Sequence, residues 1–286
     1  MLLMSAVHHD LRPPLKWAGG KRWLVPNLTR AWDVHRHRRL VEPFCGGLAV
    51  ALGLQPAEAL LSDINPHVVN FYRWLQRGLK RVPFTQAHDN EKTRYYALRD
   101  EFNALIASRD GQASQRAAEL FYYLNRTGYN GLCRFNRKGK FNTPFGRHKT
   151  IHYHEDFSEY APVLARWDFH AMHFSQIALC PDDFIYADPP YDVEFTQYSS
   201  EKFDWSDQVT LATWLARHTG PVIASNQATP RILDLYRGLG FSIIQLKAPR
   251  RISSSGDRTP AMEMLAFRNL EEGLVMTTLP LPLVYE

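Results

Sequence analysis

The stretch FIYADPPYD, residues 184–192, brings together groups that could bind a flat aromatic ring. An apolar run ends in a carboxylate, Asp188, and Pro189, Pro190 and Tyr191 follow it directly. A strand ending in a turn would account for any one of these residues, but not for their combination. The carboxylate can accept a hydrogen bond, the prolines restrict φ and so fix the direction of a carbonyl, and Tyr191 offers a face for stacking. We interpret the stretch as a clamp for a purine base swung out of a nucleic acid.

A second group of residues suits a nucleoside. VEPFCGG (41–47) places a glycine turn after one predicted strand, and LLSDIN (60–65) places Asp63 at the end of the next. Ligands of open α/β sheets bind beyond the carboxyl ends of the strands, so Asp63 is positioned to meet ribose hydroxyls. The sequence has neither the G-x-G-x-x-G fingerprint nor a P-loop, which favours a nucleoside without a pyrophosphate.

The positive charge of the 286-residue chain is local. Its net charge is +5, but residues 121–154 contain seven Lys or Arg and no Asp or Glu. These basic residues are Arg126, Arg134, Arg137, Lys138, Lys140, Arg147 and Lys149. Basic residues interleaved with aromatics are typical of nucleic-acid binding. The alternative is a solvated loop whose charges bind nothing.

Strands and helices alternate on both sides of this basic region. A strand, a glycine turn at Gly46–Gly47 and a helix are expected in that order over 39–54. Further strands are expected within 58–66, 182–191, 221–226, 240–249 and 261–269. Further helices are expected over 67–79, 93–108, 114–126 and 206–218, the last with Ser206 as N-cap. The pattern predicts an α/β sheet with an inserted, mainly helical module. We place the catalytic domain at 1–66 and 155–286, and the inserted domain at 67–154.

The cysteines and the apolar segments indicate in which compartment the protein works and whether it holds a metal. Three cysteines, Cys45, Cys133 and Cys180, lie far apart, which argues against a disulfide framework and against a zinc site of paired cysteines. No signal peptide or membrane span is recognisable in the sequence. We expect a cytoplasmic protein that uses no metal.

Seven segments, in order, resemble the Dam-type DNA adenine-N6 methyltransferases. They are LKWAGGK (15–21), VEPFCGG (41–47), LLSDIN (60–65), FYYLNRTGYNGLCRFNRKGKFNTPFGR (121–147), DPPY (188–191), ISSSG (252–256) and EMLAF (263–267). The resemblance runs from about residue 13 to 270. It implies a Rossmann-like sheet of about seven mostly parallel strands, the last antiparallel, with an inserted target-recognition domain.

The resemblance also implies a methyl donor, S-adenosylmethionine, and residues that bind it. Trp17 and Lys21 would line its pocket, Phe44 would cover the nucleoside, and Asp63 would accept the ribose hydroxyls. Asp188 would border the same pocket. FCGG in this chain departs from the F-x-G-x-G pattern that is frequent in the family.

By the same resemblance, Asp188 and the carbonyl of Pro189 would accept the N–H groups of the adenine N6 amine. This would push the nitrogen towards tetrahedral geometry and restore its nucleophilicity, with Pro190 stiffening the turn and Tyr191 stacking on the base. Direct transfer then needs no covalent intermediate and no metal. Residues 194–205 would close over the site, and residues 250–258 would form a hairpin near the target base.

The target sequence implied is GATC in double-stranded DNA. Arg134 would read guanine, Leu132 and Pro144 would contact a thymine methyl, Tyr129 would wedge into the duplex, and Asn130 would contact the orphaned base. Lys16 would touch a second guanine, and Arg137, Lys138 and Lys140 would contact phosphates. Thr127 stands where relatives often carry a larger residue. We expect a monomer in solution.

Three other interpretations remain open from the sequence. A cytosine-N4 methyltransferase would share the chemistry, but Ser is more usual than Asp before its PPY. A methyltransferase for RNA or for a protein amide would share the fold. A non-catalytic DNA-binding module would keep the basic region and lose the need for DPPY. The sequence leaves open whether the enzyme is solitary or part of a restriction-modification system.

Overall fold

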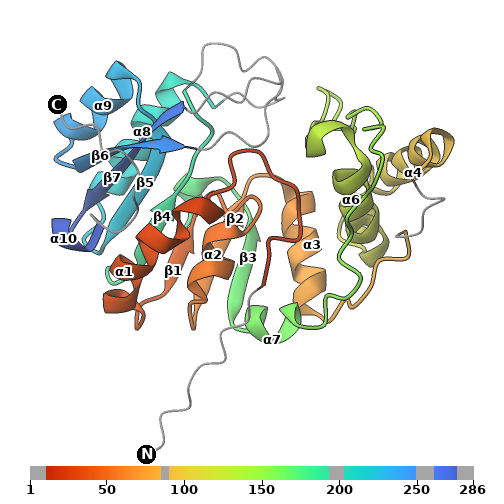
Figure 1. The fold of residues 1–286 in the computed structure, drawn as a ribbon, viewed down its shortest axis with the longest axis horizontal. Coiled ribbons are helices and arrows are strands. Elements are labelled where there is room, and N and C mark those ends of the chain that lie inside the picture. The colour runs from red at the N-terminus through yellow and green to blue at the C-terminus, as the bar shows by residue number, and fades with distance from the viewer. Residues whose placement is uncertain (1–10, 85–89, 193–202, 249–260, 276–286) are drawn as a thin grey trace, which may run out of the picture.

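A seven-stranded sheet forms the centre of the protein (Figure 1). The computed structural model describes residues 11–84, 90–192, 203–248 and 261–275. The ISSSG segment, the loop expected at 250–258 and residues 194–202 of the loop expected to close over the site lie outside these ranges. The strands are β1 (Leu40–Glu42), β2 (Ala59–Asp63), β3 (Trp167–Ala171), β4 (Phe184–Ala187), β5 (Val222–Gln227), β6 (Ser242–Ala248) and β7 (Ala261–Arg268).

The strand order is β3-β2-β1-β4-β5-β7-β6. Neighbours from β3 to β5 pair in parallel, whereas β7 is antiparallel to both β5 and β6. The predicted mostly parallel sheet with a late antiparallel strand is therefore confirmed. The chain adds strands outwards from β1 in one direction and from β4 in the other. The adjacent carboxyl ends of β1 and β4 therefore form a topological switch point, where ligands of such sheets bind.

Helices cover the sheet and form the inserted module. They are α1 (Val25–His35), α2 (Ala49–Leu54), α3 (Pro66–Gln76), α4 (Lys92–Leu105), α5 (Arg109–Gln112), α6 (Gln115–Thr127), α7 (Tyr160–Leu164), α8 (Trp205–Ala216), α9 (Pro230–Gly238) and α10 (Glu272–Val275). No helix within the described ranges is long and apolar enough to cross a bilayer.

Polar side chains at the first turns explain several helix starts. Asn65 accepts a hydrogen bond from the backbone of His67, directly before α3, and Ser114 caps α6 in the same way. For α8 the predicted N-cap, Ser206, is wrong. The cap is Asp204, whose carboxylate accepts the backbone N–H groups of Ser206 and Asp207, because a carboxylate two residues earlier can reach both donors.

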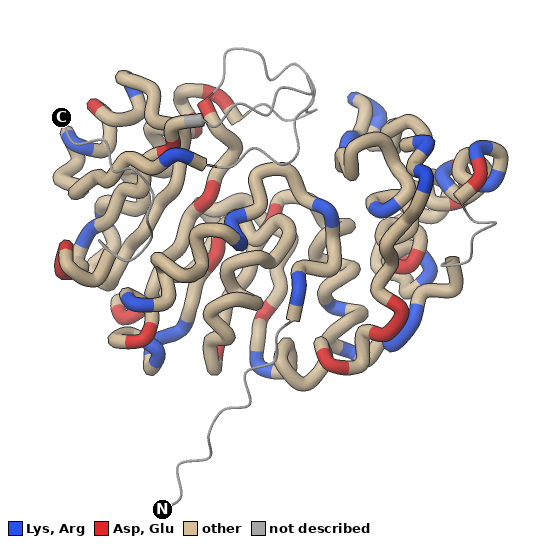
Figure 2. The backbone as a smooth tube through the Cα atoms, viewed as in Figure 1, with Lys and Arg blue, Asp and Glu red and all other residues tan. Residues whose placement is uncertain are grey.

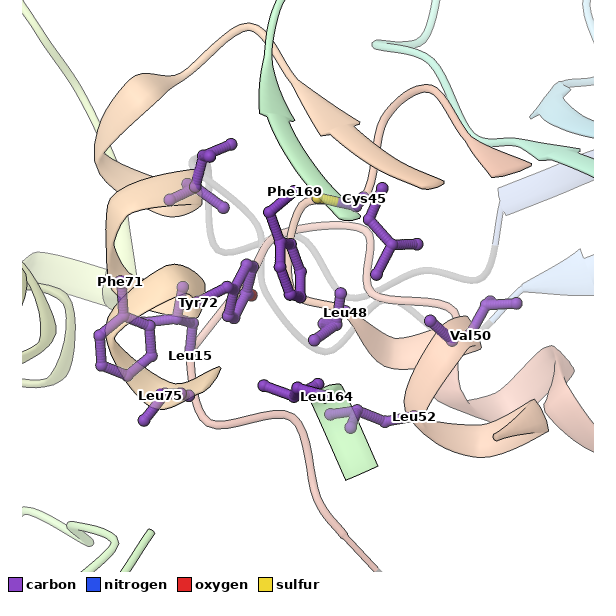
Figure 3. Packing of buried hydrophobic residues seen from close by; sticks show 14 of the residues in the cluster. Leu15, Cys45, Leu48, Val50, Leu52, Phe71, Tyr72, Leu75, Leu164 and Phe169 are labelled. Atoms are coloured by element: carbon purple, nitrogen blue, oxygen red, sulfur yellow. The ribbon is translucent and has the colours of Figure 1, made fainter. Parts of the chain in front are cut away.

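Helix α3 connects the sheet to the inserted helices (Figure 1). On one side Tyr72 packs against Phe169 of β3, with ring centroids 5.5 Å apart. On another side Phe71 stacks on Tyr122 of α6, at 5.5 Å and 13° between planes. Figure 3 shows Phe71, Tyr72 and Phe169 within this continuous apolar cluster. The inserted module is thus packed on the sheet domain through a shared core.

Strand β3 lies at one edge of the sheet, and two side chains of α3 donate to its main chain. The guanidinium of Arg73 donates to the carbonyl of Phe169. The amide of Gln76 donates to the carbonyls of Leu164 and Trp167, at 2.7 Å each. The exposed margin of the sheet is therefore partly bonded by side chains.

Candidate active site

Asp188 follows the last residue of β4, at the switch point of the sheet. Its Oδ1 lies 3.1 Å from Nζ of Lys21 and accepts a hydrogen bond of 2.7 Å from Oγ of Ser225 on β5. The side chain keeps 21% of its surface exposed. The structure thus brings together two predicted site residues, Asp188 and Lys21, that lie far apart in the sequence.

Lys21 is a buried cation among acids and an aromatic ring. Its ammonium donates to the carbonyl of Gly19 at 2.6 Å and lies 3.8 Å from Oε2 of Glu263. It also lies 4.8 Å from the ring centroid of Tyr191. Its side chain is 3% exposed, so the charge depends on Asp188 and its other neighbours for stabilisation. This single amine links the glycine loop to the strand ends β4 and β7.

Two buried amides hold the proline pair in place. The side chain of Gln208 on α8 donates to the carbonyl of Pro190 at 2.8 Å. Its oxygen accepts from the amide of Asn226 on β5 at 2.9 Å. Both amides are fully buried.

Burial, with the charges of Asp188 and Glu263, raises the pKa of the Tyr191 phenol well above its usual value, so this ring stays neutral.

The carboxylate of Asp63, at the end of β2, binds the glycine turn after β1. Oδ2 accepts from the backbone of Gly46 at 3.0 Å and Oδ1 from the backbone of Asn65 at 2.9 Å. Burial raises the pKa of Asp63 to about 6, and these two N–H groups oppose the rise. The hydroxyl of Tyr72 on α3 donates to the carbonyl of Gly46 at 2.7 Å and so also holds the turn in place.

Trp17 packs directly on this turn. A Cβ atom on Gly46 would lie 2.5 Å from Nε1 of Trp17, and one on Gly47 would lie 2.7 Å from its Cβ. Gly46 also has φ +42°, a conformation that favours glycine. Phe44 is half-buried, and its ring contacts Phe174 and Phe203 with centroids 5.8 and 5.7 Å apart.

Several site residues were not identified from the sequence. Glu42, at the end of β1, is 3% exposed; burial and the charge of Asp188 raise its pKa well above the usual range. Its position, an acid after an apolar strand, matches that of Asp63 and Asp188 and could have marked it. Ser225 had only a weak signal, a polar residue near the end of a predicted strand.

Apart from Lys16, the remaining predicted residues lie in the segment after α6, which we call the recognition hairpin (residues 128–146). Its two sides meet at the bridges Gly128–Phe145 and Phe135–Phe141. The side-chain oxygen of Asn136 accepts the backbone N–H groups of Lys138 and Lys140 and closes the tip. The hairpin is therefore an ordered element, and not an open loop.

Predicted DNA-contacting side chains lie along this hairpin. Tyr129 is 45% exposed, and the next residue, Asn130, has φ +51°. Arg137 and Lys138 are exposed at the tip. Figure 2 shows Lys and Arg positions along the inserted module. Of the two expected apolar contacts, Leu132 is half-buried and Pro144 is exposed.

The guanidinium of Arg134 is already oriented within the recognition hairpin. Nε donates to Oδ1 of Asn142 at 2.8 Å, and Nη2 donates to its carbonyl at 3.2 Å. Side chains held by such contacts lose less entropy when they bind a base.

Lys16 joins the loop of residues 15–21 to α6. Its backbone N–H donates to Oδ1 of Asn125 at 2.8 Å, and Nδ2 of Asn125 donates back to its carbonyl at 2.8 Å. Nζ of Lys16 donates to the carbonyl of Arg126 at 3.1 Å. Burial and the charge of Arg126 lower the pKa of Lys16. A Cβ on Gly131 would lie 2.6 Å from Cβ of Lys16, so the hairpin touches this loop as well.

No group of three or more His, Cys, Asp or Glu is placed to hold a metal ion within the described part of the chain.

Comparison with known proteins gives a consistent picture. Residues 17–252 match the model of the D12 class N6 adenine-specific DNA methyltransferases. The chain is 36% identical over 265 residues to the retron Ec67 DNA adenine methylase of Escherichia coli, covering 88% of this chain and 90% of that protein. It is 37% identical over 275 residues to a DNA adenine methylase of Vibrio cholerae, covering 88% and 94%. A DNA adenine methylase of Salmonella typhimurium is 33% identical over 270 residues, covering 88% and 93%. The matched span includes both the strand-end residues and the recognition hairpin.

Proposed function

Because the chain belongs to the D12 class of N6 adenine-specific DNA methyltransferases, we propose that it transfers the methyl of S-adenosylmethionine to adenine in GATC. The adenine would be swung out of double-stranded DNA before it reacts. The observation that carries this proposal is the position of Asp188, held by Lys21 and Ser225 at the switch point of the sheet.

The residues at the ends of β1 and β2 suit an adenosyl group with an amino-acid tail. The carboxylate of Asp63 faces the glycine turn and can accept ribose hydroxyls, while Trp17 packs over that turn and would bound the pocket. Phe44 borders the same strand end. The buried ammonium of Lys21 can meet a carboxylate of the ligand. S-adenosylmethionine supplies an electrophilic methyl on a sulfonium.

The DPPY turn suits an exocyclic amine. The N6 lone pair of adenine is delocalised into the ring, and acceptors for its N–H groups draw the nitrogen towards tetrahedral geometry. Asp188 provides one acceptor and the carbonyl of Pro189 the second, since the carbonyl of Pro190 is bonded to Gln208. The nitrogen–methyl bond would form as the sulfur–methyl bond breaks, and the amine would then lose one proton to Asp188 or to solvent. Acceptors fixed beforehand lower the barrier without reorganising.

Tyr191 can offset the cost of extruding the base. Stacking on an aromatic side chain contributes about 1–3 kcal/mol per base, comparable with the few kcal/mol that flipping costs. The neutral, half-buried ring of Tyr191 near Asp188 supports this role.

Target choice is assigned to the recognition hairpin and to Lys16. Arg134 would contact guanine O6 and N7 through two hydrogen bonds, a contact that discriminates by about 1–3 kcal/mol. Leu132 and Pro144 would meet a thymine methyl, Tyr129 would fill the space left by the adenine, and Asn130 would bind the orphaned partner. Phosphate contacts are assigned to Arg137 and Lys138.

We further propose that the protein acts as a monomer, with catalytic residues in 1–66 and 155–286 and target recognition in 67–154.

The test is methylation of a plasmid. The protein is incubated with S-adenosylmethionine and plasmid, which is then digested with endonucleases that differ in sensitivity to adenine methylation at GATC. We expect protection by the wild type and none by Asp188→Ala, which should still bind DNA. A plasmid left open to digestion at every GATC site would reject the assigned specificity.

A further inference from the structure

We propose that Ser225 is a positioning residue that holds one oxygen of Asp188, Oδ1. The other oxygen, Oδ2, is then oriented to accept a hydrogen bond from the target amine. The inference rests on the proposed function, because it assigns the oxygen that performs the step given to Asp188. It concerns a residue of β5 that lies 37 positions from Asp188 in the sequence.

Two polar contacts of the Asp188 carboxylate end on the same atom. Ser225 donates to Oδ1 at 2.7 Å, and the ammonium of Lys21 lies 3.1 Å from Oδ1. The hydrogen bond from Ser225 and the closest approach of the Lys21 ammonium are thus both to Oδ1. A carboxylate bound by one donor can rotate about its Cβ–Cγ bond and exchange its oxygens. Two donors on one oxygen, from different parts of the fold, oppose that rotation.

The serine hydroxyl is itself oriented. Oγ of Ser225 lies 3.1 Å from the hydroxyl of Tyr186 on β4. Because Ser225 has one hydroxyl hydrogen and uses it on Asp188, the phenol of Tyr186 must donate in this contact. Burial raises the pKa of Tyr186 well above its usual value, which keeps the donor proton in place. A chain of donors therefore runs from Tyr186 through Ser225 to Asp188.

The three residues sit on a rigid support. Tyr186 and Ser225 are 2% and 1% exposed, and they lie on neighbouring parallel strands. Asn226, next to Ser225, bonds Gln208, which holds the carbonyl of Pro190. One strand thus positions both the carboxylate and the proline turn. Groups held this way keep a reactive geometry within the narrow limits that transfer requires.

The experiment compares Ser225→Ala and Tyr186→Phe with Asp188→Ala and with a matched control, Tyr236→Phe. Tyr236 is also a buried phenol, but its hydroxyl has no hydrogen-bond partner in the described part of the chain. The single-turnover rate of methyl transfer to a GATC duplex reports the chemical step, since product release can limit kcat. Affinities for S-adenosylmethionine and for DNA are measured alongside.

We expect Ser225→Ala to slow methyl transfer by about 10- to 100-fold, the effect of removing one hydrogen bond to a charged group. Both affinities should stay within about twofold of the wild type, because Ser225 touches neither ligand in this arrangement. Tyr186→Phe should slow transfer less, and Tyr236→Phe should not change it.

The failures of the two proposals are distinguishable. A wild-type transfer rate in Ser225→Ala, while Asp188→Ala is inactive, overturns the positioning role and leaves the proposed function intact. An equal fall in affinity and rate would also overturn it, because a purely structural role produces that result. If Ser225→Ala does not fold, Tyr186→Phe decides: a rate equal to that of Tyr236→Phe rejects the inference. An active Asp188→Ala rejects the proposed function itself.

Discussion

At Asp63, burial and hydrogen bonding act on one carboxylate in opposite directions. Burial raises its pKa to about 6 although two backbone N–H groups stabilise the ionised form. Its pKa in the folded chain is above its unfolded value of about 3.8. The resulting contribution to folding stability is complete below pH 3.8 and is lost as the pH rises through about 6. The carboxylate is kept at an energetic cost, which is typical of a binding site.

The affinity for S-adenosylmethionine should therefore depend on pH. Above about pH 7 it should be constant, and below about pH 6 it should fall by up to tenfold per pH unit, because protonation removes an acceptor for the ribose hydroxyls. Calorimetric titration between about pH 5 and 8 measures this. Asp63→Asn should bind weakly and without that dependence. A wild-type affinity that is the same at both ends of this range would contradict the role of Asp63.

The glycine turn offers a steric prediction. Gly47→Ala would place a Cβ atom 2.7 Å from Cβ of Trp17, so Trp17 must move away from the turn. We expect binding of S-adenosylmethionine to weaken by about tenfold or more, since a small displacement at a packed site is costly. Gly238→Ala is the control, because a Cβ there meets nothing within 4 Å. Equal affinities in the two variants would count against Trp17 as a wall of the pocket.

At the scale of elements, His67 connects α3 to the recognition hairpin. Its ring stacks on Phe135, with centroids 4.8 Å apart and 18° between planes. It is 6% exposed, and burial lowers its pKa from 6.5 to about 4. The unfolded chain therefore takes up a proton between pH 6.5 and 4 that the folded protein does not. Stability is lost as the pH falls through this window.

Replacing this ring should reduce the sensitivity of the protein to acid. The free energy of unfolding should fall by up to about 3 kcal/mol more in the wild type than in His67→Phe between pH 6.5 and 4. Urea unfolding of both proteins at several pH values provides the comparison. Parallel pH profiles would show that His67 titrates normally and that burial does not lower its pKa.

Two asparagines of the inserted module each make a pair of hydrogen bonds to the backbone of another segment. Asn125 makes two hydrogen bonds to the backbone of Lys16, and Asn103 of α4 makes two to the backbone of Phe141. Only the first reaches the loop that carries Trp17 and Lys21. Asn125 is therefore a candidate for coupling cofactor binding to DNA binding.

Asn125→Ala and Asn103→Ala separate coupling from stability. Each should lower the free energy of unfolding by about 1–3 kcal/mol, because buried backbone groups lose their partners. Only Asn125→Ala should reduce the factor by which S-adenosylmethionine changes the affinity for DNA. DNA titrations with and without the cofactor measure this factor. If this factor were the same in both variants, Asn125 would not couple the binding of S-adenosylmethionine to the binding of DNA.

Much of the architecture could be predicted from the sequence because its strands are apolar runs that end at polar residues. Strand β3 was missed although its WDFHA sequence alternates buried and exposed residues, because it is only five residues long and contains no continuous apolar run. Trp17, Lys21, Asp63 and Asp188 lie in recognisable motifs, and the structure brings them to one end of the sheet. Ser225 and Gln208 act through hydrogen bonds across 37 and 18 positions. No local pattern specifies such pairings.

For the whole molecule, two kinds of DNA contact are expected: phosphate contacts from exposed basic residues, and base contacts from a basic residue that the fold already orients. Lys138 is exposed at the hairpin tip, whereas Arg134 is held by Asn142. Lys138→Ala should weaken binding to all duplexes alike and reduce the slope of log affinity against log salt by about 0.9. Arg134→Ala should chiefly relax the preference for one guanine. Fluorescence anisotropy with matched and mismatched duplexes distinguishes them, and identical behaviour would refute this division of roles.

An unprotected margin of a sheet can template the addition of another copy, and so lead to aggregates. In this protein Arg73 and Gln76 take up the carbonyls on the β3 side before a foreign strand could. The carbonyls of Phe169 and Trp167 are thereby less available to a strand of another molecule, because of two side chains remote from Asp188.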